Sequence, residues 1–230
     1  MNELIELGIY IAIGIPAGLF LGACFIYVFN KIPAKWLCDY GEEPCRDLVD
    51  KDVDRLKTYP NLYYLQSFFI TMWISISVVN ENPLYYVVTF IIITWLLMMI
   101  AVADAKYAII PDQFLLFLLL MAGALVPFGN SVKSILIGAV AGAVIMLFVA
   151  VVGYFLSKKE SLGFGDVKLM MVIGALTGFT GCLIVMVIAS MVSGIWFSIA
   201  LVRKRIKIGE MKPLGPFLCG AAIFYLLCFN

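Results

Sequence analysis

Residues 163–180 read GFGDVKLMMVIGALTGFT and place an acid at the start of an apolar segment. Gly163 and Gly165 come just before Asp166, and glycine permits backbone angles that are closed to other residues. A helix over 167–180 would be about 21 Å long, shorter than a hydrocarbon core of about 30 Å. We therefore expect Asp166 to lie within the membrane, where a charged side chain is costly and needs a reason.

The composition of the chain is that of an integral membrane protein. Hydrophobic residues make up 63% of the 230 positions and charged residues only 13%, and the mean hydropathy is +1.05, which excludes an ordinary soluble domain. Because a span needs about 20 apolar residues, the sequence predicts an all-α, polytopic membrane protein with about eight transmembrane helices. The predicted spans are 4–29, 65–80, 84–103, 114–129, 134–156, 167–180, 181–202 and 214–229. The first carries Glu3 and Glu6 instead of a basic leader, so we expect a retained span.

The basic residues predict an orientation. With eight spans and an outer N-terminus, the basic residues beyond the first span fall on one side of the membrane, except Lys133. Cytoplasmic loops collect Lys and Arg, so we expect both termini outside and one short cytoplasmic loop over about 30–64. The predicted division is 1–64, the first helix with this loop, and 65–230, the remaining spans. Asp104 and Asp166 then share the cytoplasmic face of a cell membrane.

Asp104 is the second acid beside hydrocarbon, at the end of the third predicted span. Pro111 follows seven residues later and cannot continue a helix, so Asp104 is expected in a last helical turn. The chain has no histidine, which leaves carboxyl groups as its most plausible chemical groups. Two facing carboxyls share a proton and activate water for attack on a peptide bond. The plainer alternatives are a charged span end at Asp104 and a favourable helix N-terminal acid at Asp166.

The cysteines do not indicate a metal site. Only two of the six lie in the predicted loop, Cys38 and Cys45. Their C-x6-C spacing, without histidine or a second pair nearby, is a poor zinc pattern. In the reducing cytoplasm we also expect no disulfide between them. We expect no metal and no nucleic-acid partner, and the lipid bilayer as surroundings.

Three motifs resemble the prepilin peptidases, the G-x-G-D class of membrane aspartic proteases. Asp104 followed by Ile110-Pro111-Asp112 is similar to the first family aspartate and its I-P-D. The stretch 163–170, GFGDVKLM, is similar to the second, and 213–218, PLGPFL, is similar to the family's P-F-G-P-x-L. The resemblance implies that Asp104 and Asp166 are catalytic. The supporting motif residues are Gly163, Gly165, Lys168, Pro111, Asp112, Pro213, Gly215 and Pro216.

This resemblance implies an endopeptidase that removes the leader peptide of type IV prepilins or related pseudopilins at the cytoplasmic membrane face. An archaeal-type preflagellin peptidase or another G-x-G-D protease is the nearer alternative. A small ion-coupled or proton-coupled transporter is the alternative from another class, because membrane acids also carry ions. We find no internal repeat in the sequence, which weighs against the transporter.

The N-terminal region resembles the family less closely. Residues 22–33 are similar to the family's G-S-F-L-N-x-x-x-x-R-L-P, but Ala23, Cys24 and Ile26 replace the serine, phenylalanine and asparagine. Many members also methylate the new N-terminus from S-adenosylmethionine, an activity associated with this region. Because the motif is altered, we expect weak or absent methylation and no cofactor.

Two further patterns concern the loop and the fifth span. Residues 39–54 contain seven acids and two bases, and this charge would attract a basic leader peptide if it faced the site. A solvated loop surface is an equally good interpretation of that run. Gly138 and Gly142 are small residues four apart, which predicts close helix packing.

Overall fold

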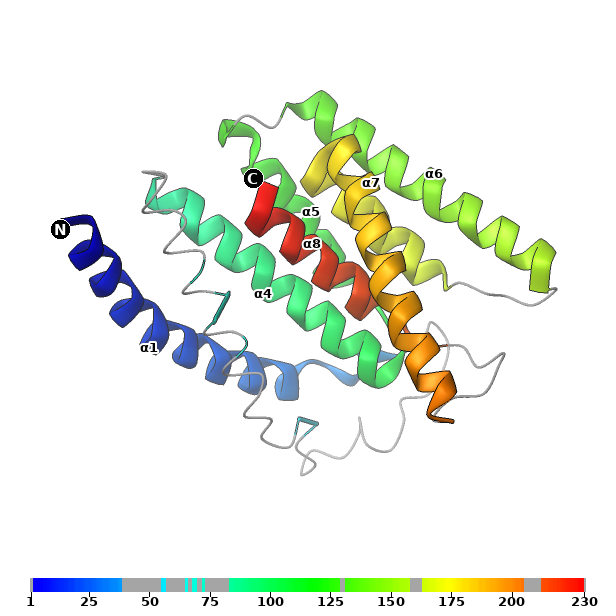
Figure 1. The fold of residues 1–230 in the computed structure, drawn as a ribbon, viewed down its shortest axis with the longest axis horizontal. Coiled ribbons are helices and arrows are strands. Elements are labelled where there is room, and N and C mark those ends of the chain that lie inside the picture. Colours follow the sequence, from blue (N-terminus) through cyan, green and yellow to red (C-terminus); the bar gives the residue numbers. More distant parts are fainter. Residues whose placement is uncertain are drawn as a thin grey trace. The chain divides into compact units, whose positions relative to one another are not determined.

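The computed structural model describes residues 2–38, 55–56, 65, 68–69, 72, 83–128, 131–157, 163–204 and 212–229. The elements are α1 (Asn2–Lys31), η1 (Ala34–Leu37), α4 (Leu84–Tyr107), α5 (Asp112–Ala124), η2 (Val126–Phe128), α6 (Val132–Ser157), α7 (Phe164–Val202) and α8 (Gly215–Phe229). Figure 1 shows these helices in sequence colours. Every element in the described ranges is helical, which confirms the all-α prediction for them.

The chain forms two compact units, residues 1–99 and 100–230. The division falls within α4, whose residues 100–107, about two turns, belong to the second unit. The domain boundary predicted between residues 64 and 65 stays a prediction. The acidic stretch 39–54, Cys45 and most of the predicted span 65–80 lie outside the described residues.

Four described helices are long and apolar enough to cross a membrane. The qualifying stretches are Gly14–Lys31, Leu84–Tyr107, Val132–Phe155 and Phe164–Val202. The apolar helices α5 and α8 have 13 and 15 residues, fewer than the roughly 20 that a span needs. The described part therefore supports a multi-pass membrane protein, and the number eight stays a prediction.

In the first unit, the end of α1 is tied to residues far along the chain. The Leu56 N–H donates to Asn30 Oδ1 over 2.9 Å, and the Arg55 guanidinium donates to the Ile32 carbonyl. Buried Phe25 stands edge-on to Trp95, with 6.1 Å between ring centroids. These contacts fix the end of α1 within this unit.

In the second unit, α7 is broken at Gly178. This residue has φ 69° and ψ −176°, a backbone region that is essentially restricted to glycine. The helix therefore consists of two segments, 164–177 and 179–202, and the chain turns back between them (Figure 1). The break between the sixth and seventh predicted spans is confirmed, at Gly178 instead of after Thr180.

Helix α6 packs against the first segment of α7 with backbone touching backbone. A Cβ built on Gly138 would lie 2.0 Å from the Gly174 carbonyl oxygen, and one on Gly142 would lie 2.3 Å from the Met170 carbonyl oxygen. No side chain fits at such distances, so the close packing predicted from these glycines is confirmed. The contact fixes the segment of α7 that carries Asp166 in its first turn.

Substituting Gly138 by Ala tests this packing. We expect Gly138→Ala to lower the free energy of unfolding by about 1–3 kcal/mol, because both contacting groups are backbone and cannot swing aside. Gly194→Ala is the matched control, because no described residue outside its own stretch of helix has an atom within 4 Å of its built Cβ. Alanine favours helix over glycine by about 1 kcal/mol, so this control should be neutral or slightly stabilising. Equal unfolding midpoints for the two variants in detergent would contradict the packing.

Candidate active site

Asp104 lies in the last turn of α4, and its side chain is only 5% exposed. The helix ends three residues later, where Ala108 takes a left-handed φ of 54° and its N–H donates to the Asp104 carbonyl over 2.8 Å. A left-handed residue at this place is a common way to stop a helix. The predicted end of this helix shortly after Asp104 is therefore confirmed.

The Asp104 carboxylate is held by the first residue of α8. The Gly215 N–H donates to Asp104 Oδ2 over 2.8 Å. A Cβ on Gly215 would lie 2.5 Å from the same oxygen, so only glycine permits this approach. The amides of the first helical turn have no partner within their own helix, and a carboxylate satisfies them well.

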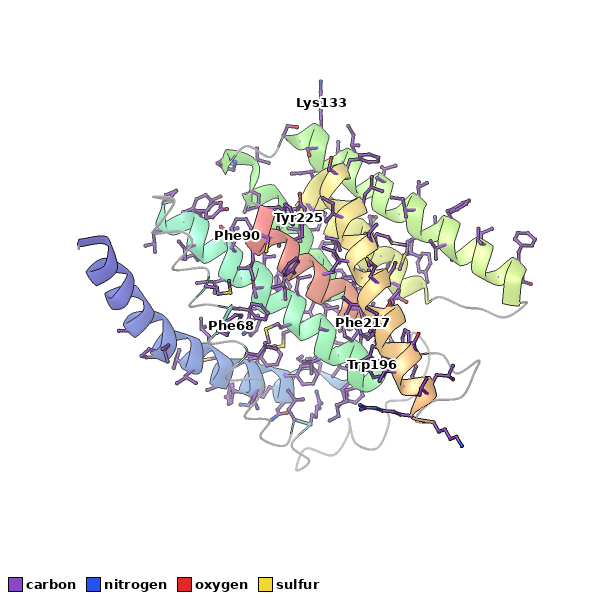
Figure 2. The ribbon with its side chains drawn as sticks, viewed as in Figure 1. Phe68, Phe90, Lys133, Trp196, Phe217 and Tyr225 are labelled. Carbon is purple, nitrogen blue, oxygen red and sulfur yellow. The ribbon has the colours of Figure 1, made fainter. Side chains whose placement is uncertain are left out.

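An aromatic cluster keeps the start of α8 against the second segment of α7. The ring of Phe217 lies 5.8 Å from that of Trp196 and 5.6 Å from that of Phe197, between centroids. Figure 2 shows Trp196 and Phe217 side by side. The cluster lies two residues beyond Gly215, so it steadies the amide that meets Asp104.

Asp166 lies in the first turn of α7 and is 9% exposed. Its N–H donates to the carbonyl of Gly163, the residue that precedes the helix, over 3.1 Å. A Cβ on Gly165 would lie 3.3 Å from the Ile110 side chain, so the motif glycine makes room for the isoleucine before Pro111. Among the described residues, Asp166 Oδ1 is buried without a hydrogen-bond partner.

The structure brings the two acids together. Asp104 and Asp166 are 62 residues apart in sequence, yet their carboxyl groups lie close enough to repel each other electrostatically. The buried thiol of Cys219 interacts electrostatically with both. The apolar surroundings of Cys219 in the sequence indicated only a small buried residue, although its position directly after the PLGPFL motif was a usable signal.

Lys168 and Asp112 form an ion pair that the sequence did not predict. The Lys168 ammonium lies 2.8 Å from both carboxylate oxygens of Asp112, and the two side chains are 35% and 41% exposed. It also lies 5.4 Å from the centre of the Phe164 ring. The contact joins the first residue of α5 to the second turn of α7. Both partners belong to motifs, but nothing in the spacing showed that they meet.

The three motif prolines stand at helix starts. Pro111 precedes α5 and is buried, and its carbonyl accepts the N–H groups of Phe114 and Leu115. Pro213 precedes α8, and Pro216 is the second residue of that helix. Proline is tolerated there because the first turn needs no amide donor. In the described ranges, no three His, Cys, Asp or Glu side chains gather as metal ligands.

Comparison with known proteins agrees with this arrangement. Residues 91–199 match the family model described as the type IV leader peptidase family. The resemblance predicted from the sequence is thereby confirmed. The matched segment contains Asp104, Asp112, Asp166 and Lys168, while Gly215 lies beyond it.

Curated relatives carry the same description. The chain is 35% identical over 109 residues to a prepilin leader peptidase/N-methyltransferase of Aeromonas salmonicida, covering 46% of this chain and 35% of the relative. It is 33% identical over 105 residues to the protein of that name in Burkholderia pseudomallei, covering 42% and 34%. The chain thus aligns with about a third of the length of these relatives. No solved structure matches the chain.

Substituting Gly215 by Ala tests the contact with Asp104. We expect Gly215→Ala to lower the unfolding midpoint in detergent, because the new methyl group would displace a buried carboxylate from the Gly215 amide that donates to it. The loss should be about 1–3 kcal/mol. Gly220→Ala in the same helix is the control, since its built Cβ has no atom within 4 Å from the rest of the described chain, its own helical turn aside. The contact is refuted if both variants unfold alike.

Proposed function

We propose that this protein is a membrane aspartic endopeptidase that cleaves the leader peptide from type IV prepilins or related pseudopilins. The observation that carries the proposal is the pair of buried acids Asp104 and Asp166, with Asp166 within electrostatic range of Asp104. Both lie in the segment matched to the leader peptidase family. The relatives in Aeromonas salmonicida and Burkholderia pseudomallei are named prepilin leader peptidase/N-methyltransferase. The substrate class comes to this chain from those names.

The proposed chemistry uses the two carboxyls in different protonation states. The ionised carboxyl takes a proton from a water molecule while the water oxygen attacks the scissile carbonyl carbon. The neutral carboxyl donates its proton to the carbonyl oxygen as the tetrahedral intermediate forms. As the C–N bond breaks, the leaving amine takes the proton that the first carboxyl removed from water, and the second carboxyl takes back a proton from a hydroxyl of the intermediate. Asp104 is oriented for this step by the Gly215 amide. Asp166 Oδ1 is the oxygen with spare hydrogen-bonding capacity toward water or substrate.

We further propose that the site faces the cytoplasm. In the second unit, the hydroxyl of Ser134 would lie 2.8 Å from a Cβ on Gly178, so the start of α6 meets the α7 break. Asp166 stands 12 residues before this break, about 18 Å along a helix. The neighbouring Lys133 projects outward from the start of α6 (Figure 2). The start of α6 lies at the Gly178 end of segment 164–177 and Asp166 lies at the other end, which supports the orientation inferred from the basic residues.

Neutralising either acid tests the proposed function. Asp104→Asn or Asp166→Asn should reduce cleavage of a prepilin-like substrate at saturation by about a thousandfold, because each removes one proton-transfer group. The unfolding midpoint in detergent checks that each variant is folded. Asp47→Asn, a loop acid outside the described residues, is the matched control and should keep its kcat. Full turnover by either aspartate variant would refute the assignment.

Methylation is proposed to be weak or absent, because Ala23, Cys24 and Ile26 alter the N-terminal motif. The protein is incubated with an uncleaved prepilin-like substrate and labelled S-adenosylmethionine. When cleavage is complete, we expect the new N-terminus to carry no label. Labelling that keeps pace with cleavage would contradict this expectation. A synthetic peptide with a free mature N-terminus separates slow methylation from slow cleavage.

A further inference from the structure

The ion pair between Lys168 and Asp112 is used by no step of the proposed chemistry, although each partner is near one of the two acids along the chain. Both distances from the ammonium to the carboxylate oxygens are 2.8 Å. The pair joins the start of α5 to the start of α7. Asp112 belongs to the I-P-D motif and Lys168 to the GFGDVKLM motif. Its partners are 56 residues apart in sequence, so the contact is a tertiary one.

Each partner is close along the chain to one of the acids. Lys168 follows Asp166 by two residues in one helix, a rise of about 3 Å, so the two move as one body. Asp112 follows Asp104 by eight residues. The connection between them leaves the helix at Ala108, with its left-handed φ of 54°, and re-enters helix after Pro111.

This non-helical connection has no helical hydrogen-bond ladder to fix its course. Two contacts hold its far end against α7: the Ile110 side chain, which lies 3.3 Å from a Cβ built on Gly165, and the ion pair at Asp112. From the other side, the Gly215 amide holds Asp104. Three contacts thus link the surroundings of Asp104 to those of Asp166, and the ion pair is the one among them that is made by two charged side chains.

We propose that Lys168 and Asp112 are a positioning pair that sets the separation of the Asp104 and Asp166 carboxyls. The expected effect on turnover rests on the proposed peptidase function. The expected effect on the distance between the two carboxyls does not. A partly exposed ion pair contributes little to global stability. A displacement of about 1 Å in reacting groups, in contrast, costs about a hundredfold in rate. The pair should therefore matter for turnover far more than for folding.

The kinetic test compares Lys168→Met, Asp112→Asn and the charge-exchanged double variant Lys168→Asp with Asp112→Lys. We expect each single variant to lower kcat at least tenfold, within the range that misplaced groups produce, with KM for a prepilin-like peptide nearly unchanged. The double variant should regain most of kcat, since it restores an ion pair with the opposite sense. Lys133→Met, in the first turn of α6, is the charge-removal control and should leave kcat unchanged.

A geometric test needs no substrate. Asp104 and Asp166 are replaced by cysteine in a Cys219→Ala background, because the native thiol lies next to both positions. A short bifunctional methanethiosulfonate then reports their proximity as the yield of the 104–166 cross-link, mapped by mass spectrometry. We expect Lys168→Met to lower this yield several-fold and the charge-exchanged pair to restore it. Lys133→Met should not change it.

The outcomes separate the two proposals. A wild-type protein that cleaves no prepilin-like peptide would refute the proposed function, and the cross-link yield would then decide the positioning role alone. An unchanged yield in Lys168→Met would overturn the inference whatever the activity. A rise in KM with constant kcat, or a charge-exchanged variant as slow as the product of the two single losses, would also overturn it. A rise in KM with constant kcat would mean that Lys168 contacts the substrate instead.

Discussion

The hydrogen bond from the Gly215 N–H to Asp104 Oδ2 is the contact on which the candidate site depends. It satisfies a carboxylate that is almost fully buried and ties the last turn of α4 to the first turn of α8. Burying a carboxyl is unfavourable unless it gains such partners, and any side chain at position 215 would occupy the place of the oxygen. The glycine of the third motif is therefore explained by the acid of the first.

The second acid reaches the same place through helix packing. Gly138 and Gly142 of α6 bring its backbone against α7, and Gly178 lets α7 turn back within the same unit. Asp166 stands at the start of the segment that these contacts hold. Two carboxyls placed close together repel each other, which resists their simultaneous ionisation and favours a shared proton. The acid and base roles of the proposed hydrolysis thus follow from the arrangement of the pair.

The sequence predicted features that depend on local chemistry. Apolar length predicted helices, Pro111 predicted the end of the helix that carries Asp104, and small residues predicted the contact made by Gly138. It did not predict the pairing of Lys168 with Asp112 or of Gly215 with Asp104, because these join residues 56 and 111 positions apart. Nothing local encodes such a contact; it follows from how several helices pack at once. The predicted loop and second span lie largely outside the described residues, so the span count stays a prediction.

The central claim is that Asp104 and Asp166 act as one coupled carboxyl pair. The most direct measurement treats the purified protein with an epoxide that esterifies ionised aspartates and maps the esters by mass spectrometry. The account predicts that Asp166 is esterified faster in the Asp104→Asn variant than in the unaltered protein, because removing the neighbouring charge favours the ionised, reactive form of Asp166. An Asp166 esterification rate that is the same in the variant and in the unaltered protein would contradict it.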